Sequence, residues 1–433
     1  MRWIFRNVQV IGLKSVLSHG WVLVRNGRIE ALSSGEPPQE ILQEEQVSST
    51  RKDDVPMEVP GKMPQASEQK AGDGITVVDG QGGYLSPGFV DLHVHGGGGD
   101  DFSDASADAY LSALKTHLRG GTTTILPTLM TGSLSRILEN VAVYEALAAH
   151  PPAGLPHLGG LHLEGPYFSP VQLGAQDGRY VRLPQPEEYR QILEAGPHIR
   201  RWAAACELPG ALEFGESIAR RGVIPCIGHS DATLDQVRQA LQAGYRCVTH
   251  LYSSCSMVHR NGPFREGGIV EAAYLFDGLD VEMIGDGIHL PPDFMRMIYQ
   301  IKGPDTIALI TDCIRPGGQN LPEGTISYSD RERQRPVVVE SGVAIMPDRK
   351  SFAGSIATMG RVVQTAVRMA GIPLWDAVRM ASLTPARMLG LDAEIGSIAP
   401  GKRADLVLLD KDLAVGSVFI PDGQDGLMRI CAE

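Results

Sequence analysis

The sequence lacks paired cysteines, clustered basic residues and long apolar runs. None of its six cysteines forms a C-x-x-C pair, which argues against a zinc knuckle or disulfide framework and favours free thiols in a reducing compartment. A net charge of -12 argues against a nucleic-acid surface, because phosphate backbones are bound by clustered Lys and Arg. No apolar run reaches the ~20 residues of a membrane span, and Met1–Val10 lacks the uninterrupted apolar core of a signal peptide. We therefore expect a cytoplasmic protein that acts on a small molecule, away from nucleic acid and membranes.

Short β-rich apolar runs alternate with helical patterns through the middle of the chain. The runs are Leu85–Leu92, Thr122–Leu126, Leu158–Leu163, Trp202–Ala205, Val223–Ile227, Cys247–Thr249, Val281–Ile284 and Ile307–Ile310. Alternation of this kind is typical of βα units around a parallel sheet. The number of runs, over roughly the 250 residues of a typical barrel, favours an α/β fold of the (β/α)8 TIM-barrel type over an open doubly wound sheet, which remains the alternative.

The two ends of the chain have a different pattern. Asn26-Gly27 between apolar segments predicts a β-hairpin, and Arg403–Asp410 predicts another strand. Residues 33–74 are polar and poor in aromatics, which predicts a flexible insertion. We expect both termini to build a small β-sandwich, its N-terminal part over residues 1–86 and its C-terminal part over residues 395–433, beside a catalytic barrel over residues 87–394.

Polar residues that could bind a metal stand where the predicted strands end. They are His93 and His95 after the first run, Glu164 after the third, His229 after the fifth, His250 after the sixth and Asp312 after the eighth. Barrel enzymes assemble their sites from these strand ends, and imidazoles with carboxylates suit Zn²⁺, Fe²⁺, Mn²⁺ or Co²⁺. Glu164, His229 and His250 would give three ligands and leave a position open for water. His93 and His95 share one face of a strand and could hold a second ion.

Asp312 has a predicted role of its own beside the metal. A carboxylate at that place can take a proton from a metal-activated water and return it to a departing amine. The alternative is that Asp312 caps the segment that follows it. Further along, Gly354–Ser355 is predicted to begin a helix, whose free N–H groups could hold an oxygen of a ligand.

Several segments together resemble a known family, the N-acetylglucosamine-6-phosphate deacetylases of the amidohydrolase superfamily. They are PGFVDLHVHG at 87–96, GTTTILPT at 121–128, HLEGPY at 162–167, IGHSDAT at 227–233, THLY at 249–252, GDGIHL at 285–290, TDC at 311–313, FAGS at 352–355 and GSIAPGKRADLVLLD at 396–410. The resemblance spans most of the chain. HLEGPY, GHSDAT and GDGIH are fairly specific to these deacetylases, whereas HxH and GKRADLVLLD occur in many amidohydrolases.

The resemblance implies a role for individual residues. Glu164, His229 and His250 correspond to the primary metal ligands, His93 and His95 to a pair for a second ion, and Asp312 to the catalytic acid and base. His289 corresponds to a residue that helps the metal polarise the amide carbonyl. The substrate pocket would be lined by Ala175, Gln176, Ser253, Ser254, Arg265, Asp286, Gly287, Ile288, Phe352, Ala353 and Gly354.

The chain departs from the family pattern where the substrate would bind. Gln176 replaces a histidine that contacts substrate, and Ser253-Ser254 replaces Asn-Ala. The family's phosphate-binding arginine could align with Arg260 or Arg265, and Arg-Glu-Gly-Gly favours Arg265.

We therefore predict metal-dependent hydrolysis of an N-acetyl amino sugar 6-phosphate, foremost N-acetylglucosamine 6-phosphate, with one or two divalent ions per subunit in a homodimer. N-acetylgalactosamine 6-phosphate, an unphosphorylated acetyl sugar and another N-acyl compound are alternative substrates. A barrel that only binds a ligand is the alternative from a different class.

Overall fold

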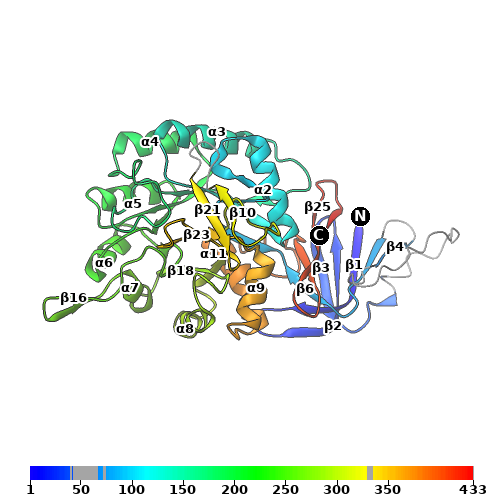
Figure 1. The fold of residues 1–433 in the computed structure, drawn as a ribbon. Helices are drawn as coiled ribbons and strands as arrows, with labels where there is room; N and C mark the ends of the chain where they lie inside the picture. Colours follow the sequence, from blue (N-terminus) through cyan, green and yellow to red (C-terminus); the bar gives the residue numbers. More distant parts are fainter. Residues whose placement is uncertain (40, 42–66, 72–74, 329–334, 433) are drawn as a thin grey trace.

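The computed structural model describes residues 1–39, 41, 67–71, 75–328 and 335–432. A barrel with surrounding helices forms one part of the molecule, and a sheet near both termini forms the other (Figure 1). The predicted fold class is confirmed.

Parallel strands form the barrel. They are β7 (Phe89–Val94), β10 (Thr122–Leu129), β12 (Leu161–Glu164), β13 (Ile199–Ala204), β14 (Ile224–Ile227), β15 (Cys247–Val248), β18 (Asp280–Ile284) and β19 (Ile307–Ile310), with the short β11 (His157–Leu158) beside β10. Both faces of these strands are covered, so nearly all of their residues are buried. The ends of β19 and β7 are joined by the Asp312 N–H, which donates to the His93 carbonyl at 2.9 Å.

Helices follow most barrel strands and cover the outside. They are α2 (Ala107–Arg119), α3 (Leu134–Ala149), α4 (Pro186–Ala195), α5 (Ala211–Ala219), α6 (Leu234–Gln242), α7 (Ile269–Leu275), α8 (Pro292–Lys302), α9 (Met359–Arg368), α10 (Leu374–Ala381) and α11 (Leu383–Met388). Local sequence sets some of their starts. Thr233 and Gln236 form a reciprocal capping box at α6, and the Ser133 side chain caps α3.

The two chain ends meet in one mixed sheet, ordered β26-β25-β24-β6-β1-β2-β3, with β5 beside β1 and β4 beside β5. Its strands are β1 (Arg2–Ile11), β2 (Val16–Arg25), β3 (Arg28–Ser34), β4 (Ser67–Ala71), β5 (Ile75–Asp79), β6 (Tyr84–Pro87), β24 (Leu406–Leu409), β25 (Val415–Pro421) and β26 (Leu427–Cys431). Asn26 and Gly27 turn β2 into β3 with φ of 52° and 70°, which fits a turn with two left-handed residues. Trp3, Phe5 and Phe419 form its aromatic core.

Two local predictions need separate comment. Residues 42–66 and 72–74 of the predicted flexible insertion lie outside the described residues, whereas Ser67–Ala71 form β4, paired antiparallel with β5. The helix predicted to begin at Gly354–Ser355 is wrong. Phe352–Ser355 is strand β23, because it pairs with Val343–Ile345 (β22), and the helix starts later, at Met359.

Smaller elements lie around the barrel mouth. Strands β20 (Thr325–Tyr328) and β21 (Pro336–Glu340) extend the sheet of β22 and β23, and β8 (Gly96–Gly97) pairs with β9 (Asp100–Asp101). A hairpin of β16 (His259–Asn261) and β17 (Phe264–Glu266) projects from the far side of the barrel (Figure 1). In the part of the chain described here, no helix is long and apolar enough to cross a membrane.

Candidate metal centre

The predicted ligands come together at the carboxyl ends of the barrel strands. His93 and His95 stand at the end of β7, Glu164 at the end of β12, and His229 and His250 just after β14 and β15. All are buried, with exposures of 5% or less. Buried polar side chains need partners, and here most of these partners are one another.

Glu164 is the centre of the cluster. Its Oε1 lies 2.9 Å from His250 Nε2, 3.1 Å from His229 Nε2 and 3.4 Å from His93 Nε2. Its Oε2 lies 3.3 Å from His95 Nε2. One carboxylate therefore faces the Nε2 atoms of all four predicted imidazole ligands.

Asp312 lies on the other side of the His93–His95 pair. Its Oδ1 is 3.3 Å from His95 Nε2 and 3.7 Å from His93 Nε2. Ligand atoms of His93, His95 and Asp312 fall within 4.8 Å of one another, as do those of His93, Glu164 and His250. His93 thus belongs to two adjoining triads.

The outer nitrogens of three rings are tied to oxygen acceptors. His229 Nδ1 lies 2.8 Å from the Gln172 carbonyl, His250 Nδ1 3.0 Å from the Ser253 carbonyl, and His93 Nδ1 2.9 Å from Glu282 Oε2. Because these oxygens only accept, Nδ1 carries a hydrogen, and Nε2, which faces the Glu164 carboxylate, is the nitrogen that a metal ion could bind in place of a proton.

The electrostatics of the cluster favour a cation. Although burial opposes charge on each group, Glu282 and Glu164 raise the pKa of His93, and Asp312 and Glu164 raise the pKa of His95 to about 9. Burial likewise opposes charge on Glu164, yet His93 and His229 hold the pKa of this carboxyl well below its usual range. The pKa of Asp312 is also lowered against burial, chiefly by His95. The carboxylates thus create a negative potential that a metal ion could neutralise in place of protons.

The backbone at the site is held in an unusual conformation. His229, His250 and Asp312 have φ of 48°, 28° and 47°, in the left-handed region. Non-glycine residues rarely adopt it, and such residues cluster at functional sites. The barrel therefore holds these side chains at a conformational cost.

The residues present fit a divalent cation. In the described part of the chain, the buried Nε2 of His93 has no hydrogen-bond partner, although it faces two carboxylates. Imidazole nitrogens and carboxylate oxygens at this spacing are the ligands that Zn²⁺ and similar ions prefer.

A cavity of about 290 Å³ opens above the cluster. Its lining includes the cluster residues His95, Glu164, His229, His250 and Asp312, together with His289, Tyr252, Ala175, Gln176, Ser253, Ser254, Phe352, Ala353 and Gly354. Most of the predicted substrate-binding residues thus border one space. Gln176, the departure from the family pattern, donates to Glu164 Oε2 at 2.6 Å and accepts from the Thr131 N–H at 3.1 Å. Its amide therefore orients the central carboxylate.

His289 enters the cavity on a short loop after β18. Its Nδ1 lies 2.7 Å from Asp286 Oδ2, while Asp286 Oδ1 accepts from the Ile288 and His289 N–H groups at 2.9 Å each. Asp286 therefore fixes His289, with Nε2 free for a ligand. Asp286, Gly287 and Ile288 do not themselves border the cavity.

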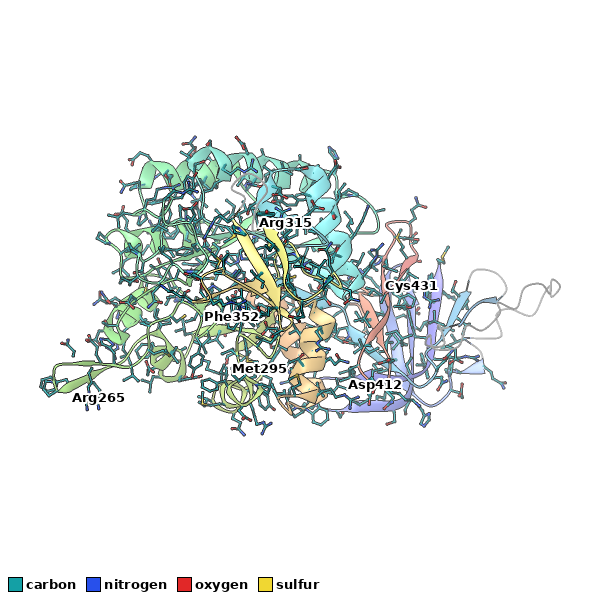
Figure 2. The ribbon with its side chains drawn as sticks, viewed as in Figure 1. Arg265, Met295, Arg315, Phe352, Asp412 and Cys431 are labelled. Atoms are coloured by element: carbon teal, nitrogen blue, oxygen red, sulfur yellow. The ribbon has the colours of Figure 1, made fainter. Side chains whose placement is uncertain are left out.

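The two candidate phosphate-binding arginines lie elsewhere. Arg260 and Arg265 face each other across the exposed β16–β17 hairpin. Figure 2 shows Arg265 at this outlying hairpin, far from Phe352. Among the described residues, none that lines the cavity is Lys or Arg.

Sequence reasoning missed a polar layer beneath the cluster. Glu282 and Arg201 are ion-paired inside the barrel, at 0% and 1% side-chain exposure. Burial raises the pKa of nearby Asp91 to about 7, against hydrogen bonds from Thr311. A charged residue between apolar neighbours inside a strand, such as Glu282 between Val281 and Met283, was the available signal.

Comparisons with known proteins agree with this geometry. The model of the amidohydrolase family matches residues 84–426. The chain is 34% identical over 355 residues to the N-acetylglucosamine-6-phosphate deacetylase of Lysinibacillus sphaericus, covering 82% of this chain and 88% of that one. It is also 34% identical over 350 residues to the N-acetylgalactosamine-6-phosphate deacetylase of Escherichia coli O157:H7, covering 80% and 89%.

Solved structures give the same picture. The N-acetyl-D-glucosamine-6-phosphate deacetylase of Mycobacterium smegmatis, solved in complex with N-acetyl-D-glucosamine-6-phosphate, superposes with a TM-score of 0.79 at 32% identity, over 98% of both chains. The enzyme from Pasteurella multocida gives a TM-score of 0.81 at 27% identity, over 97% of this chain and 98% of that one.

Proposed function

This chain belongs to the amidohydrolase family, and we propose that it hydrolyses the acetamide of an N-acetylhexosamine 6-phosphate. The foremost substrate is N-acetylglucosamine 6-phosphate, which would yield glucosamine 6-phosphate and acetate. N-acetylgalactosamine 6-phosphate is a second candidate, because a deacetylase of that sugar phosphate is as similar in sequence as one of the glucosamine type.

One observation carries the proposal. Glu164 lies within 3.5 Å of four imidazole Nε2 atoms, and Asp312 borders the same cavity. We propose Glu164, His229 and His250 as the primary metal ligands, and His93 and His95 as the pair that binds a second ion.

The residues around the cluster have distinct proposed roles. A divalent cation supplies Lewis acidity to the acetyl carbonyl and makes water a stronger acid. Asp312 takes the proton from the attacking water and delivers it to the nitrogen as the C–N bond breaks. His289, with its ring fixed by Asp286, polarises the acetyl oxygen that becomes negative. Water is consumed, and the products are the free amine and acetic acid.

The phosphate needs a cation, and no Lys or Arg stands among the described residues that line the cavity. We propose that Arg265 of the partner subunit binds the phosphate in a homodimer, because the hairpin carries this side chain away from its own cavity (Figure 2). Arg265→Ala should then raise KM for phosphorylated sugars alone. At a substrate concentration below the KM of Arg265→Ala, mixed dimers of Arg265→Ala and Asp312→Asn subunits should be more active than either parent, and mixtures no more active than the parents would contradict this arrangement.

A substrate panel tests the function. Acetate release is measured with N-acetylglucosamine and N-acetylgalactosamine, each with and without a 6-phosphate, and with an N-acetyl amino acid. We expect turnover of the 6-phosphates, highest kcat/KM for N-acetylglucosamine 6-phosphate, and little for the others. Equal turnover of the unphosphorylated sugars would contradict the proposal that the substrate carries a 6-phosphate. If no compound of the panel released acetate, the proposed function itself would be contradicted.

A further inference from the structure

A fully buried carboxylate lies behind the cluster, and none of the roles proposed above uses it. Glu282, in β18, has an exposure of 0% and sits among apolar neighbours in its strand. A charge in such a place is costly unless it is paired. Its Oε1 accepts from Arg201 Nη1, so the pairing exists.

Arg201 is itself held from several sides. Nη1 also donates to the Leu92 carbonyl at 3.3 Å, and Nη2 contacts the Sγ atoms of Cys226 and Cys247, each at 3.2 Å. The guanidinium is therefore a fixed counter-ion that holds Glu282 in one orientation.

The second oxygen of Glu282 faces the cluster. Oε2 lies 2.9 Å from His93 Nδ1 and accepts from the His250 backbone N–H at 3.2 Å. It thus fixes the ring of one ligand and the main chain of another. Because His93 belongs to both adjoining triads, its orientation affects both.

The rings of His229 and His250 are also fixed through Nδ1, but by weaker partners than a carboxylate. His229 and His250 donate from Nδ1 to neutral carbonyl oxygens, at 2.8 Å and 3.0 Å. A carboxylate does more than a carbonyl, because its full negative charge makes the imidazole a stronger ligand and attracts the cation beyond it.

We propose that Glu282 is a positioning residue for the metal centre: with Arg201 as its counter-ion, it holds His93 so that Nε2 faces the ion. The proposal rests on the proposed function only in requiring that a metal binds. It predicts a contribution to metal affinity that is separate from fold stability.

The test measures metal binding without substrate. Chelator-treated wild type and Glu282→Gln are titrated with Co²⁺, and the dissociation constant, the stoichiometry and the visible absorption of the bound ion are recorded. We expect Glu282→Gln to weaken Co²⁺ binding about 10–100-fold and to change the absorption spectrum, because a second-sphere carboxylate is lost. Affinity within about two-fold of wild type, with an unchanged spectrum, would overturn the proposal.

Two further variants separate positioning from stability. Glu282→Gln leaves Arg201 unpaired, so the double variant Arg201→Met/Glu282→Gln removes that charge; if the single variant does not fold, the same criteria apply to the double one. Asp405→Asn is the matched control, since Asp405 is also a buried carboxylate paired with an arginine, Arg403, but lies away from the cluster. Unchanged Co²⁺ affinity in Asp405→Asn supports the proposal, and an equal loss there overturns it.

The wild-type titration distinguishes the two proposals. A wild type that binds no Co²⁺ overturns both. A wild type that binds Co²⁺ but releases no acetate overturns the proposed function alone, and the effect of Glu282→Gln on Co²⁺ affinity still decides this one.

Discussion

The two ends of the barrel each open into a cavity, and the larger cavity lies at the end without the cluster. The mouth holds about 290 Å³. The opposite cavity holds about 850 Å³ and borders Thr123 near the start of β10, His157 of β11, and Arg403 and Asp405 beside the terminal sheet. Volume alone would select the end that lacks the cluster.

The two ends differ in how their charges are arranged. At the end without the cluster, which we call the lower end, Arg403 pairs with Asp405, two positions along the chain. Arg403 also donates to Thr124 Oγ1 at 3.1 Å. At the mouth, Glu164 is shared by four imidazoles from three strand ends. A locally neutralised pair stabilises the fold, whereas side chains that converge from several strands leave ligand atoms available for an ion.

The largest expected difference between the ends comes from Asp312→Asn. The amide keeps the shape of the side chain but cannot take the proton from water, so kcat should fall about 10³-fold or more. Steady-state acetate release checks the rate, and elemental analysis should find metal content near that of wild type. A near-normal rate would refute the acid–base role.

His289→Asn should have a smaller effect at the same end. It removes the imidazole that polarises the acetyl carbonyl, and we expect kcat to fall about 10²-fold. KM should change little. A fall in metal content of the same size would show instead that His289 is a ligand.

Asp405→Asn, at the lower end, should lower stability and leave activity nearly unchanged. Loss of the carboxylate leaves Arg403 unpaired in a partly buried place, so the free energy of unfolding should drop by about 3 kcal/mol. Urea denaturation measures it. kcat/KM of the folded variant should stay within about two-fold, and a large loss of activity would contradict the division between the two ends.

The smallest expected effect concerns a buried histidine of α2 that lies outside the cluster. Burial lowers the pKa of His117 to about 4, even though Gly96 O accepts from its Nε2 at 2.8 Å. Since this folded-state pKa lies below the unfolded value of about 6.5, its stabilising contribution is present above pH 6.5 and is lost as pH falls towards 4.

Between pH 7.5 and pH 5 this group should cost about 2 kcal/mol of unfolding free energy. His117→Gln should remove that part of the pH dependence, measured by urea denaturation at several pH values. An unchanged slope would show that His117 is not buried in the neutral form.

Strand-end residues could be predicted from the sequence because the barrel couples position to function. An apolar run predicts a buried strand, and a His or Glu at its end then has only the mouth to face. This is why His93, Glu164 and His250 were found together. The strand patterns at the two ends of the chain likewise predicted that the terminal strands form one unit.

Other features depend on contacts that no local pattern contains. Gly354–Ser355 was predicted to begin a helix, but the pairing of Phe352–Ser355 with Val343–Ile345 decided its conformation. The sequence did not single out Glu282, because its proposed role depends on contacts with Arg201 and His93, which lie on two other strands. The direction of Arg265 depends on a hairpin that leaves the barrel.

Reconstitution with metal tests the central claim most directly. Protein freed of metal by chelation is titrated with Zn²⁺ or Co²⁺, and bound metal and acetate release from N-acetylglucosamine 6-phosphate are measured at each step. The account predicts that activity is absent at the start and rises in proportion to bound metal until the site is filled. Full activity in the metal-free protein, or bound metal without any gain in activity, would contradict it.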